Sequence, residues 1–163
     1  MADISRSASS GRLRIGVLGA ARIAPAALIR PATFQPEVEV VAVAARDLQR
    51  AERFAAQHGL AKAYSGYQQL LADPEIDAVY VALPNGLHGR WTRAALEAGK
   101  HVLCEKPFTA NADEAALVAE VARSTNLVVM EAFHYRYHAL VQRTLEILRS
   151  GELGTITRLD AWL

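Results

Sequence analysis

The chain has 163 residues, 52% of them hydrophobic, and this length and composition predict one compact domain with a sizeable core. The 18 basic and 17 acidic side chains nearly cancel, and no segment concentrates the basic ones, so we expect no nucleic-acid partner. No apolar run approaches the roughly 18 residues that a membrane span needs, and the single cysteine excludes an internal disulfide. Together these features predict a cytoplasmic protein without a membrane partner.

Residues 1–12 are polar and rich in serine, and they predict a disordered tail, neither a signal peptide nor an anchor. After them, short apolar segments typical of strands alternate with helical patterns. Strands are predicted over residues 13–18, 38–45, 78–83, 101–104 and 127–132 and near 63–64, and helices over 23–33, 48–58, 67–72, 90–98, 112–124 and 140–149. Strands that are apolar on both faces and separated by helices predict an α/β fold, with a doubly wound parallel sheet covered on both sides.

The loop after the first predicted strand has small residues at three spaced positions, Gly19, Ala21 and Ala24. A dinucleotide-binding fold needs a glycine at this turn, a small residue where the backbone approaches the pyrophosphate, and a small residue where helix meets strand. The free amides and the positive dipole end of the following helix suit a phosphate. The middle alanine departs from the commonest fingerprint, and the alternative interpretation is a tight packing turn.

The second predicted strand ends in Arg46 and Asp47. An acidic side chain at this point would accept hydrogen bonds from the ribose hydroxyls of NAD. Arg46 can instead pair with a 2′-phosphate and stack on adenine, so the sequence favours NADP, with NAD as the weaker candidate. The alternative for Arg46 is a solvated charge. Asp47 directly precedes a predicted helix and is expected to cap it.

A lysine follows the predicted strand 101–104, in the run Glu105-Lys106-Pro107. In an open α/β sheet, the carboxyl ends of the strands form the edge where ligands bind. A lysine at that edge can hold an anion or move a proton, and the alternative is a solvated surface lysine. Cys104, at the end of the same strand, is expected to be a buried structural thiol, because no adjacent His or Asp is placed to activate it.

Four segments carry a resemblance to a known family: residues 19–24, residues 44–47, residues 82–85 with His88, and residues 98–107. In these segments the chain resembles the N-terminal domain of the Gfo/Idh/MocA oxidoreductases, the family of glucose-fructose oxidoreductase and inositol dehydrogenase. Within that family it is similar to the branch of dimeric dihydrodiol dehydrogenase and NADP-dependent D-xylose dehydrogenase. The resemblance implies a Rossmann domain over residues 13–134 that binds a nicotinamide dinucleotide.

The resemblance also implies roles for particular residues. Lys106 would lie beside the nicotinamide and help the substrate hydroxyl lose its proton as hydride leaves. Glu105 would support Lys106, and Pro107 would follow a peptide bond that is often cis in the family. The implied catalytic residue is Lys106, the implied cofactor-binding residues are Gly19, Ala21, Arg22, Ile23, Arg46, Leu83, Pro84, Asn85, His88, Glu105, Lys106 and Arg136, and no metal site is implied. For His88, local capping or packing is an equal alternative.

The carboxyl-terminal end departs from the family pattern. Family members continue with a second domain that supplies the substrate pocket, a further acid/base residue and the oligomer interface. Residues 135–163 would form a crossover helix and the first strand of such a domain, truncated here, with the alternating pattern of a strand over residues 156–163. Ala139 stands where a proline is common in the family. The unpaired edge of that strand predicts self-association into a homo-oligomer.

Two functions from different classes follow. In the first, the chain is the cofactor half of an NADP-dependent dehydrogenase that transfers hydride between nicotinamide and a sugar, polyol or dihydrodiol hydroxyl. It would then take a small polyhydroxy substrate only together with a second domain, and the isolated chain would show no turnover. In the second, it is a free-standing dinucleotide-binding module. A purely structural role for the fold is a third, weaker interpretation, because the positions that read the cofactor are intact.

Overall fold

The computed structural model describes residues 11–160 and residue 162. The tail that the sequence predicts to be disordered therefore lies, for its residues 1–10, outside the described residues. The chain divides into two compact units, the first ending at Ala132 and the second beginning at Phe133, and each is described by itself. Among the described residues, no helix combines the length and the apolar character that a membrane crossing requires.

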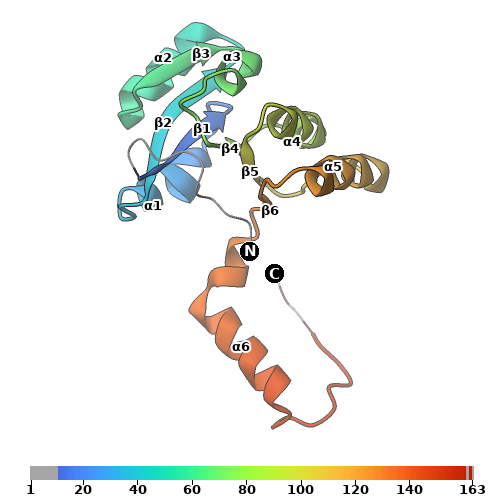
Figure 1. Ribbon diagram of the computed structural model, residues 1–163. Coiled ribbons are helices and arrows are strands. Elements are labelled where there is room, and N and C mark those ends of the chain that lie inside the picture. Colours follow the sequence, from blue (N-terminus) through green and yellow to red (C-terminus); the bar gives the residue numbers. More distant parts are fainter. Residues whose placement is uncertain (1–10, 161, 163) are drawn as a thin grey trace. The chain divides into compact units, whose positions relative to one another are not determined.

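The first unit is built on a parallel sheet that has six strands within the described residues. The strands are β1 (Leu13–Leu18), β2 (Val38–Ala45), β3 (Lys62–Ser65), β4 (Ala78–Val81), β5 (His101–Cys104) and β6 (Val129–Glu131). Their order in the sheet is β3-β2-β1-β4-β5-β6, so the chain winds one way from β1 and then the other way from β4 (Figure 1). The predicted doubly wound parallel sheet is confirmed.

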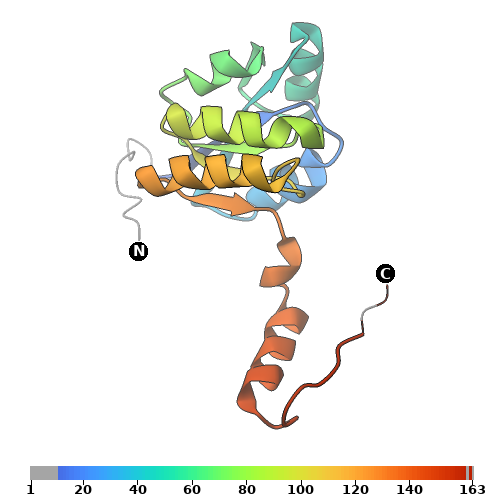
Figure 2. The same cartoon turned by 90° about the vertical axis from the view of Figure 1, so that its right-hand side faces the viewer.

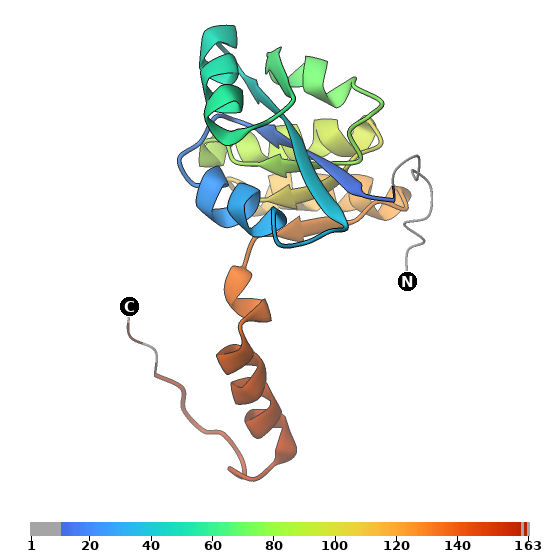
Figure 3. The ribbon, with the colours of Figure 1, turned by 90° about the vertical axis from the view of Figure 1, so that its left-hand side faces the viewer.

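Helices cover both faces of this sheet. The helices of the first unit are α1 (Arg30–Ala32), α2 (Leu48–His58), α3 (Tyr67–Leu71), α4 (His88–Glu97) and α5 (Ala112–Ser124), with the short segments η1 (Pro25–Ile29) and η2 (Asn85–Leu87). On one face, α4 and α5 lie side by side (Figure 2), and their apolar residues pack with those of α3 into one core cluster. On the other face, η1 and α2 cover the strands (Figure 3) and contribute to a second cluster.

The period-2 alternation of the strands explains the two clusters. Leu18 and Ala44 belong to the cluster under α3, α4 and α5, whereas Val17 and Val43, one residue earlier on the same strands, belong to the cluster under η1 and α2. All four side chains are fully buried. The buried, carboxyl-terminal parts of these strands therefore need apolar residues on both faces, and this continuous apolar pattern distinguishes them in the sequence.

The predicted helix over residues 23–33 forms in two pieces. Pro25–Ile29 is a π-helix in which the amide of Arg30 donates to the carbonyl of Pro25, and α1 continues it for one turn. Pro31, inside this segment, has no N–H and its ring crowds the carbonyl four residues earlier, which widens the preceding turn. Pro25 occupies the first turn, where its missing N–H leaves no helical hydrogen bond unmade.

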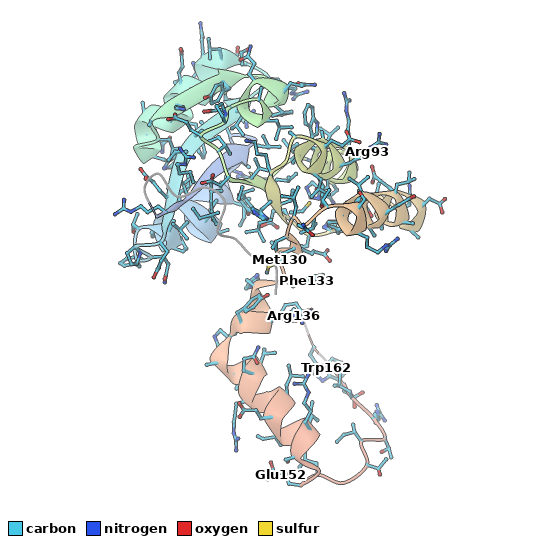
Figure 4. The ribbon with its side chains drawn as sticks, viewed as in Figure 1. Arg93, Met130, Phe133, Arg136, Glu152 and Trp162 are labelled. Carbon is cyan, nitrogen blue, oxygen red and sulfur yellow. The ribbon has the colours of Figure 1, made fainter. Side chains whose placement is uncertain are left out.

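The second unit consists of η3 (His134–Tyr137), α6 (Ala139–Ser150) and an irregular segment after Gly151. Arg136 lies on η3, and Trp162 lies in the segment beyond α6 (Figure 4). Residues 156–160 and 162, where the alternating pattern predicts a strand, form no strand. The predicted strand is therefore not observed there: a strand needs a neighbour for its N–H and C=O groups, and the described residues of the second unit include no other strand.

Candidate functional site

The carboxyl ends of the parallel strands lie along one edge of the sheet. At this edge, Gly19 follows β1, Arg46 follows β2, and Lys106 lies two residues after β5. The segment Leu83 to Asn85 follows β4, the neighbour of β1 in the sheet. The winding direction changes between β1 and β4, and at such a switch point the connecting loops diverge and leave a crevice for a ligand. The fold thus brings to one edge the sequence-predicted residues of the first unit.

Gly19 is held tightly in its turn. Its φ is +104°, a value that side chains with a Cβ rarely adopt. A Cβ at this position would lie 2.7 Å from the carbonyl oxygen of Ala82 on the neighbouring segment. The amide of Gly19 donates to the carbonyl of Ala44 on β2, at 2.9 Å. Glycine is therefore required both by the backbone conformation and by the close approach of the chain segment that follows β4.

Two amide groups at this turn are available to a ligand. The amide of Ala21 donates back to the carbonyl of Gly19, at 2.8 Å. Among the described residues, none accepts a hydrogen bond from the amides of Arg22 and Ile23, and both residues are exposed. Free N–H groups at the start of a helical segment are the donors that bind a phosphate. This turn fits the pyrophosphate of a dinucleotide, as the sequence predicts.

Arg46 and Asp47 have separate roles at the end of β2. The Oδ1 atom of Asp47 accepts a hydrogen bond from the amide of Arg50, at 2.8 Å, and caps α2 as expected. Arg46 is exposed, and among the described residues no carboxylate pairs with it. A free guanidinium at this position can accept a phosphate as its partner.

Arg50 joins the site although the sequence reasoning missed it. From the first turn of α2, its guanidinium donates to the carbonyl of Ala20 in the Gly19 turn, at 2.9 Å and across 30 residues of sequence. This hydrogen bond ties α2 to the turn and places a second cation at the Gly19 turn. The only sequence signal was a second arginine four residues after Arg46, which is common on exposed helices.

The segment after β4 presents exposed and buried residues in turn. Leu83 is buried, whereas Pro84 and Asn85 are exposed at the start of η2. His88 begins α4 and is buried, with 1% of its surface exposed. Its two ring nitrogens face main-chain carbonyls, Nδ1 that of Pro107 at 2.6 Å and Nε2 that of Leu83 at 2.7 Å. These contacts favour the packing interpretation of His88.

Lys106 projects from a loop whose neighbours are fixed. Lys106 is exposed, and the bond between Lys106 and Pro107 is cis, as the family resemblance implies. One carboxylate oxygen of Glu105 accepts a hydrogen bond from the hydroxyl of Tyr80, at 2.5 Å, and the other accepts one from the amide of Lys106, at 3.2 Å. Burial is the largest cause that raises the pKa of Tyr80, and the hydrogen bond to Glu105 is the second. The hydroxyl of Tyr80 therefore stays protonated and donates its hydrogen bond to Glu105.

Glu131 and Cys104 complete the surroundings of this loop. At the end of β6, the carboxylate of Glu131 accepts a hydrogen bond from the amide of Phe108, at 2.8 Å. Cys104 is fully buried, and burial raises its pKa to about 11, so the thiol stays protonated at neutral pH. The structural interpretation of Cys104 is therefore supported.

Arg136 is the predicted site residue that belongs to the second unit, where it lies on η3. Its contact with the cofactor stays a prediction. For the remainder of the site, the free amides at the Gly19 turn and the exposed cations of Arg46 and Lys106 form one edge that suits an anionic dinucleotide.

Comparison with known proteins agrees with this geometry. The family described as "Oxidoreductase family, NAD-binding Rossmann fold" (Gfo/Idh/MocA) matches residues 13–133. The chain is 47% identical over 144 residues to D-xylose 1-dehydrogenase (NADP(+)) 2 of Haloferax volcanii, covering 88% of this chain and 44% of that protein. It is 45% identical over 149 residues to the dTDP-3,4-didehydro-2,6-dideoxy-alpha-D-glucose 3-reductase of Saccharopolyspora spinosa, covering 91% and 45%.

A solved structure shows the same fold. The 3-ketoreductase KijD10 from Actinomadura kijaniata, in complex with NADP and TDP-benzene, superposes with a TM-score of 0.79 at 39% sequence identity, over 86% of this chain and 43% of that one. The chain thus spans less than half the length of these relatives. The matched residues include the turn after β1 and the loop after β5, and on this evidence the chain belongs to the Gfo/Idh/MocA oxidoreductase family, in its NAD-binding Rossmann domain.

Proposed function

We propose that the chain is the NADP(H)-binding domain of an oxidoreductase that transfers hydride between nicotinamide and a hydroxyl of a sugar, polyol or dihydrodiol. One observation carries the proposal: the turn of Gly19, the exposed Arg46 and the exposed Lys106 share the carboxyl edge of the sheet, on both sides of the switch point between β1 and β4. The cytoplasm is the proposed location.

The preference for NADP rests on the end of β2. No acidic side chain follows the strand directly, and Asp47 is engaged in capping α2. Arg46 supplies a free guanidinium, and Arg50 supplies a second cation on the first turn of α2. Two relatives support the same assignment, since one is named for NADP(+) and KijD10 was solved with NADP. A 2′-phosphate between these arginines would gain charge-assisted hydrogen bonds that NAD cannot offer.

Lys106 is proposed to handle the proton. When bound, the nicotinamide supplies the hydride acceptor or donor. The ammonium or amine of Lys106 would exchange the proton of the substrate oxygen, while Glu105, held by Tyr80, fixes the backbone from which Lys106 projects. Lys106 is exposed in this chain, so we expect that other residues, in a second domain, would exclude water from the reacting atoms.

Among the proposed substrate classes, a sugar, free or attached to a nucleotide, has support from the names of the relatives. The relatives are named for D-xylose and for a dTDP-linked deoxyglucose, and their additional length would hold the substrate pocket. The isolated chain should therefore bind cofactor without turning over substrate. Robust oxidation of aldoses or diols by the isolated chain would contradict the need for a second domain.

Calorimetric titration with NADPH and NADH tests the proposal. NADPH should bind more tightly than NADH, by about 1 to 3 kcal/mol, because the 2′-phosphate contact is charge-assisted. Binding without preference would contradict the role of Arg46, and no binding of either cofactor would contradict the proposed function itself.

A further inference from the structure

We propose that His88 is a positioning residue for Lys106: its ring Nδ1–H holds the carbonyl of Pro107 and so fixes the loop that carries the lysine. This inference rests on the proposed function only for its catalytic consequence. The structural part stands on the contacts of His88 alone, which join the loop after β4 to the loop after β5 at the carboxyl edge of the sheet.

The placement of His88 excludes the simpler role of a helix cap. The N-cap position of α4 is occupied by Leu87, and no side chain makes a capping hydrogen bond to this helix. His88 is itself the first residue of α4, and its ring points to carbonyls outside the helix. Because 1% of its surface is exposed, the ring has little surface left for a cofactor. The polar atoms of His88 are therefore used within the protein.

The loop after β5 needs side chains to hold it. The amide of Glu105 still donates to the carbonyl of Val81, at 3.0 Å, but beyond this residue the chain leaves the sheet. Pro107 has no N–H, so its carbonyl is the only main-chain polar group that it can offer. The ring of His88 contacts that carbonyl, and the carboxylate of Glu131 accepts a hydrogen bond from the amide of Phe108. Lys106 thus precedes a segment anchored from α4 and from β6.

His88 differs from Glu131 in what it connects. Its second nitrogen faces the carbonyl of Leu83, directly before the exposed Pro84 and Asn85. The ring thus spans two segments 24 residues apart, one predicted to face the cofactor and the other carrying Lys106. The positioning role requires a proton on Nδ1, which then donates to the carbonyl of Pro107, whereas an imidazolium donates to both carbonyls. One side chain therefore contacts both loops.

Three substitutions separate the two contacts. His88→Phe keeps a planar ring and removes both. In His88→Asn the amide nitrogen is attached to Cγ, as Nδ1 is, so it can still reach Pro107; in His88→Gln the amide nitrogen is attached to Cδ, as Nε2 is, so it can still reach Leu83. His101→Phe is the matched control, because the Nδ1 of His101 accepts from the amide of Val128 at the opposite edge of the sheet.

Order parameters of the backbone amides in the chain of 163 residues provide the first readout. We expect the amides of Lys106 and Phe108 to fall from about 0.85 to below about 0.6 in His88→Phe and in His88→Gln, and to stay near the original value in His88→Asn and in His101→Phe. Unchanged order in His88→Phe would overturn the proposal. If His88→Phe does not fold, equal order in the Asn and Gln variants would overturn it instead.

Turnover provides the second readout, in the chain joined after residue 163 to the substrate domain of a relative. His88→Phe should lower kcat by about 10- to 100-fold, as expected for a misplaced catalytic group, with KM changed by less than about threefold, and His88→Asn should restore most of the loss. In the double variant with Lys106→Ala, His88→Phe should cause no further loss. Losses that multiply would overturn the positioning role.

The two readouts distinguish the two proposals. If Lys106→Ala alone leaves turnover intact, the proposed role of Lys106 is wrong, and the order parameters still decide whether His88 holds the loop. If Lys106→Ala abolishes turnover while His88→Phe changes neither order nor kcat, Lys106 keeps its role and the inference about His88 is wrong.

Discussion

The two edges of the sheet carry similar charged residues in different states. At the amino edge the charges are paired: Arg14 contacts Asp77 at 3.3 Å, and Lys62 contacts Asp73 at 2.7 Å. Lys100 is buried there, and its ammonium donates to two main-chain carbonyls at 2.8 Å and 2.7 Å. Burial lowers its pKa. These side chains already have partners inside the protein.

At the carboxyl edge the cations are exposed. Arg22, Arg46 and Lys106 form no ion pair with any described residue. The buried polar groups of this edge, including His88 and Tyr80, hold the loops and leave these cations free. The difference teaches that paired charges at one edge contribute to stability, whereas unpaired charges held on fixed loops at the other edge are available to a ligand. Substitutions should therefore affect stability at one edge and binding at the other.

Gly19→Val should produce the largest effect. The branched side chain would meet the carbonyl of Ala82 and occupy a backbone conformation that suits glycine, so NADPH binding should be abolished and stability lowered by about 2 to 4 kcal/mol. Calorimetry and thermal unfolding measure the two effects. Gly99→Val is the matched control, because Gly99 also has a positive φ, +76°, but nothing lies within 4 Å of its Cβ position. Unchanged NADPH affinity in Gly19→Val would place the phosphate elsewhere.

Asp73→Asn should show the opposite pattern, a loss of stability without a loss of binding. Asp73 accepts hydrogen bonds from Lys62 and from the hydroxyl of Tyr64, and removing its charge should cost about 2 kcal/mol. Denaturant unfolding measures the stability, and NADPH titration provides the control. A variant that loses NADPH affinity while it stays folded would show that the two edges are not independent.

The pH dependence of stability should report the same carboxylate. Burial opposes the ionisation of Asp73, but the bonds from Lys62 and Tyr64 outweigh it and lower its pKa from 3.8 to about 2. Between these values the unfolded chain binds a proton that the folded chain does not, so the free energy of unfolding falls as the pH is lowered from about 4 to about 2. In Asp73→Asn this part of the acid sensitivity should disappear. An identical slope in both proteins would assign the acid sensitivity to other groups.

Arg46→Asp should change the choice of cofactor and leave stability alone. The gap between NADPH and NADH, expected at about 1 to 3 kcal/mol, should shrink or reverse, because an acidic group repels the 2′-phosphate and accepts from ribose hydroxyls. Arg53→Asp controls for the change in net charge, because Arg53 is an exposed arginine that lies on α2. Equal shifts in both variants would indicate a general charge effect and no specific contact.

Lys106→Ala should have the smallest effect on binding. If Lys106 handles the proton and does not mainly hold phosphate, NADPH affinity should stay within about tenfold, near 1.4 kcal/mol. Calorimetric titration of the variant and of the unmodified chain with NADPH, each at two salt concentrations, measures this difference in affinity. A larger loss that grows at low salt would reassign Lys106 to phosphate binding.

The sequence by itself determined the layers and the edge. Continuous apolar strands alternating with helices required a covered parallel sheet, and a parallel sheet puts all strand ends of one kind at one edge, so Gly19, Arg46 and Lys106 had to share it. The sequence also predicted that Asp47 caps α2, because a capping hydrogen bond joins residues three apart in the chain. These are local or periodic properties of the chain.

Only the tertiary structure decided which groups hold that edge in place. His88 meets Pro107 across 19 residues, Arg50 meets Ala20 across 30, and Glu131 meets Phe108 across 23. The obstacle at Gly19 is likewise the backbone of Ala82. The strand predicted after residue 155 did not form in the described residues, since pairing requires a neighbour that no local pattern supplies. Such contacts form between loops that follow different strands, so the spacing of residues within one segment cannot predict them.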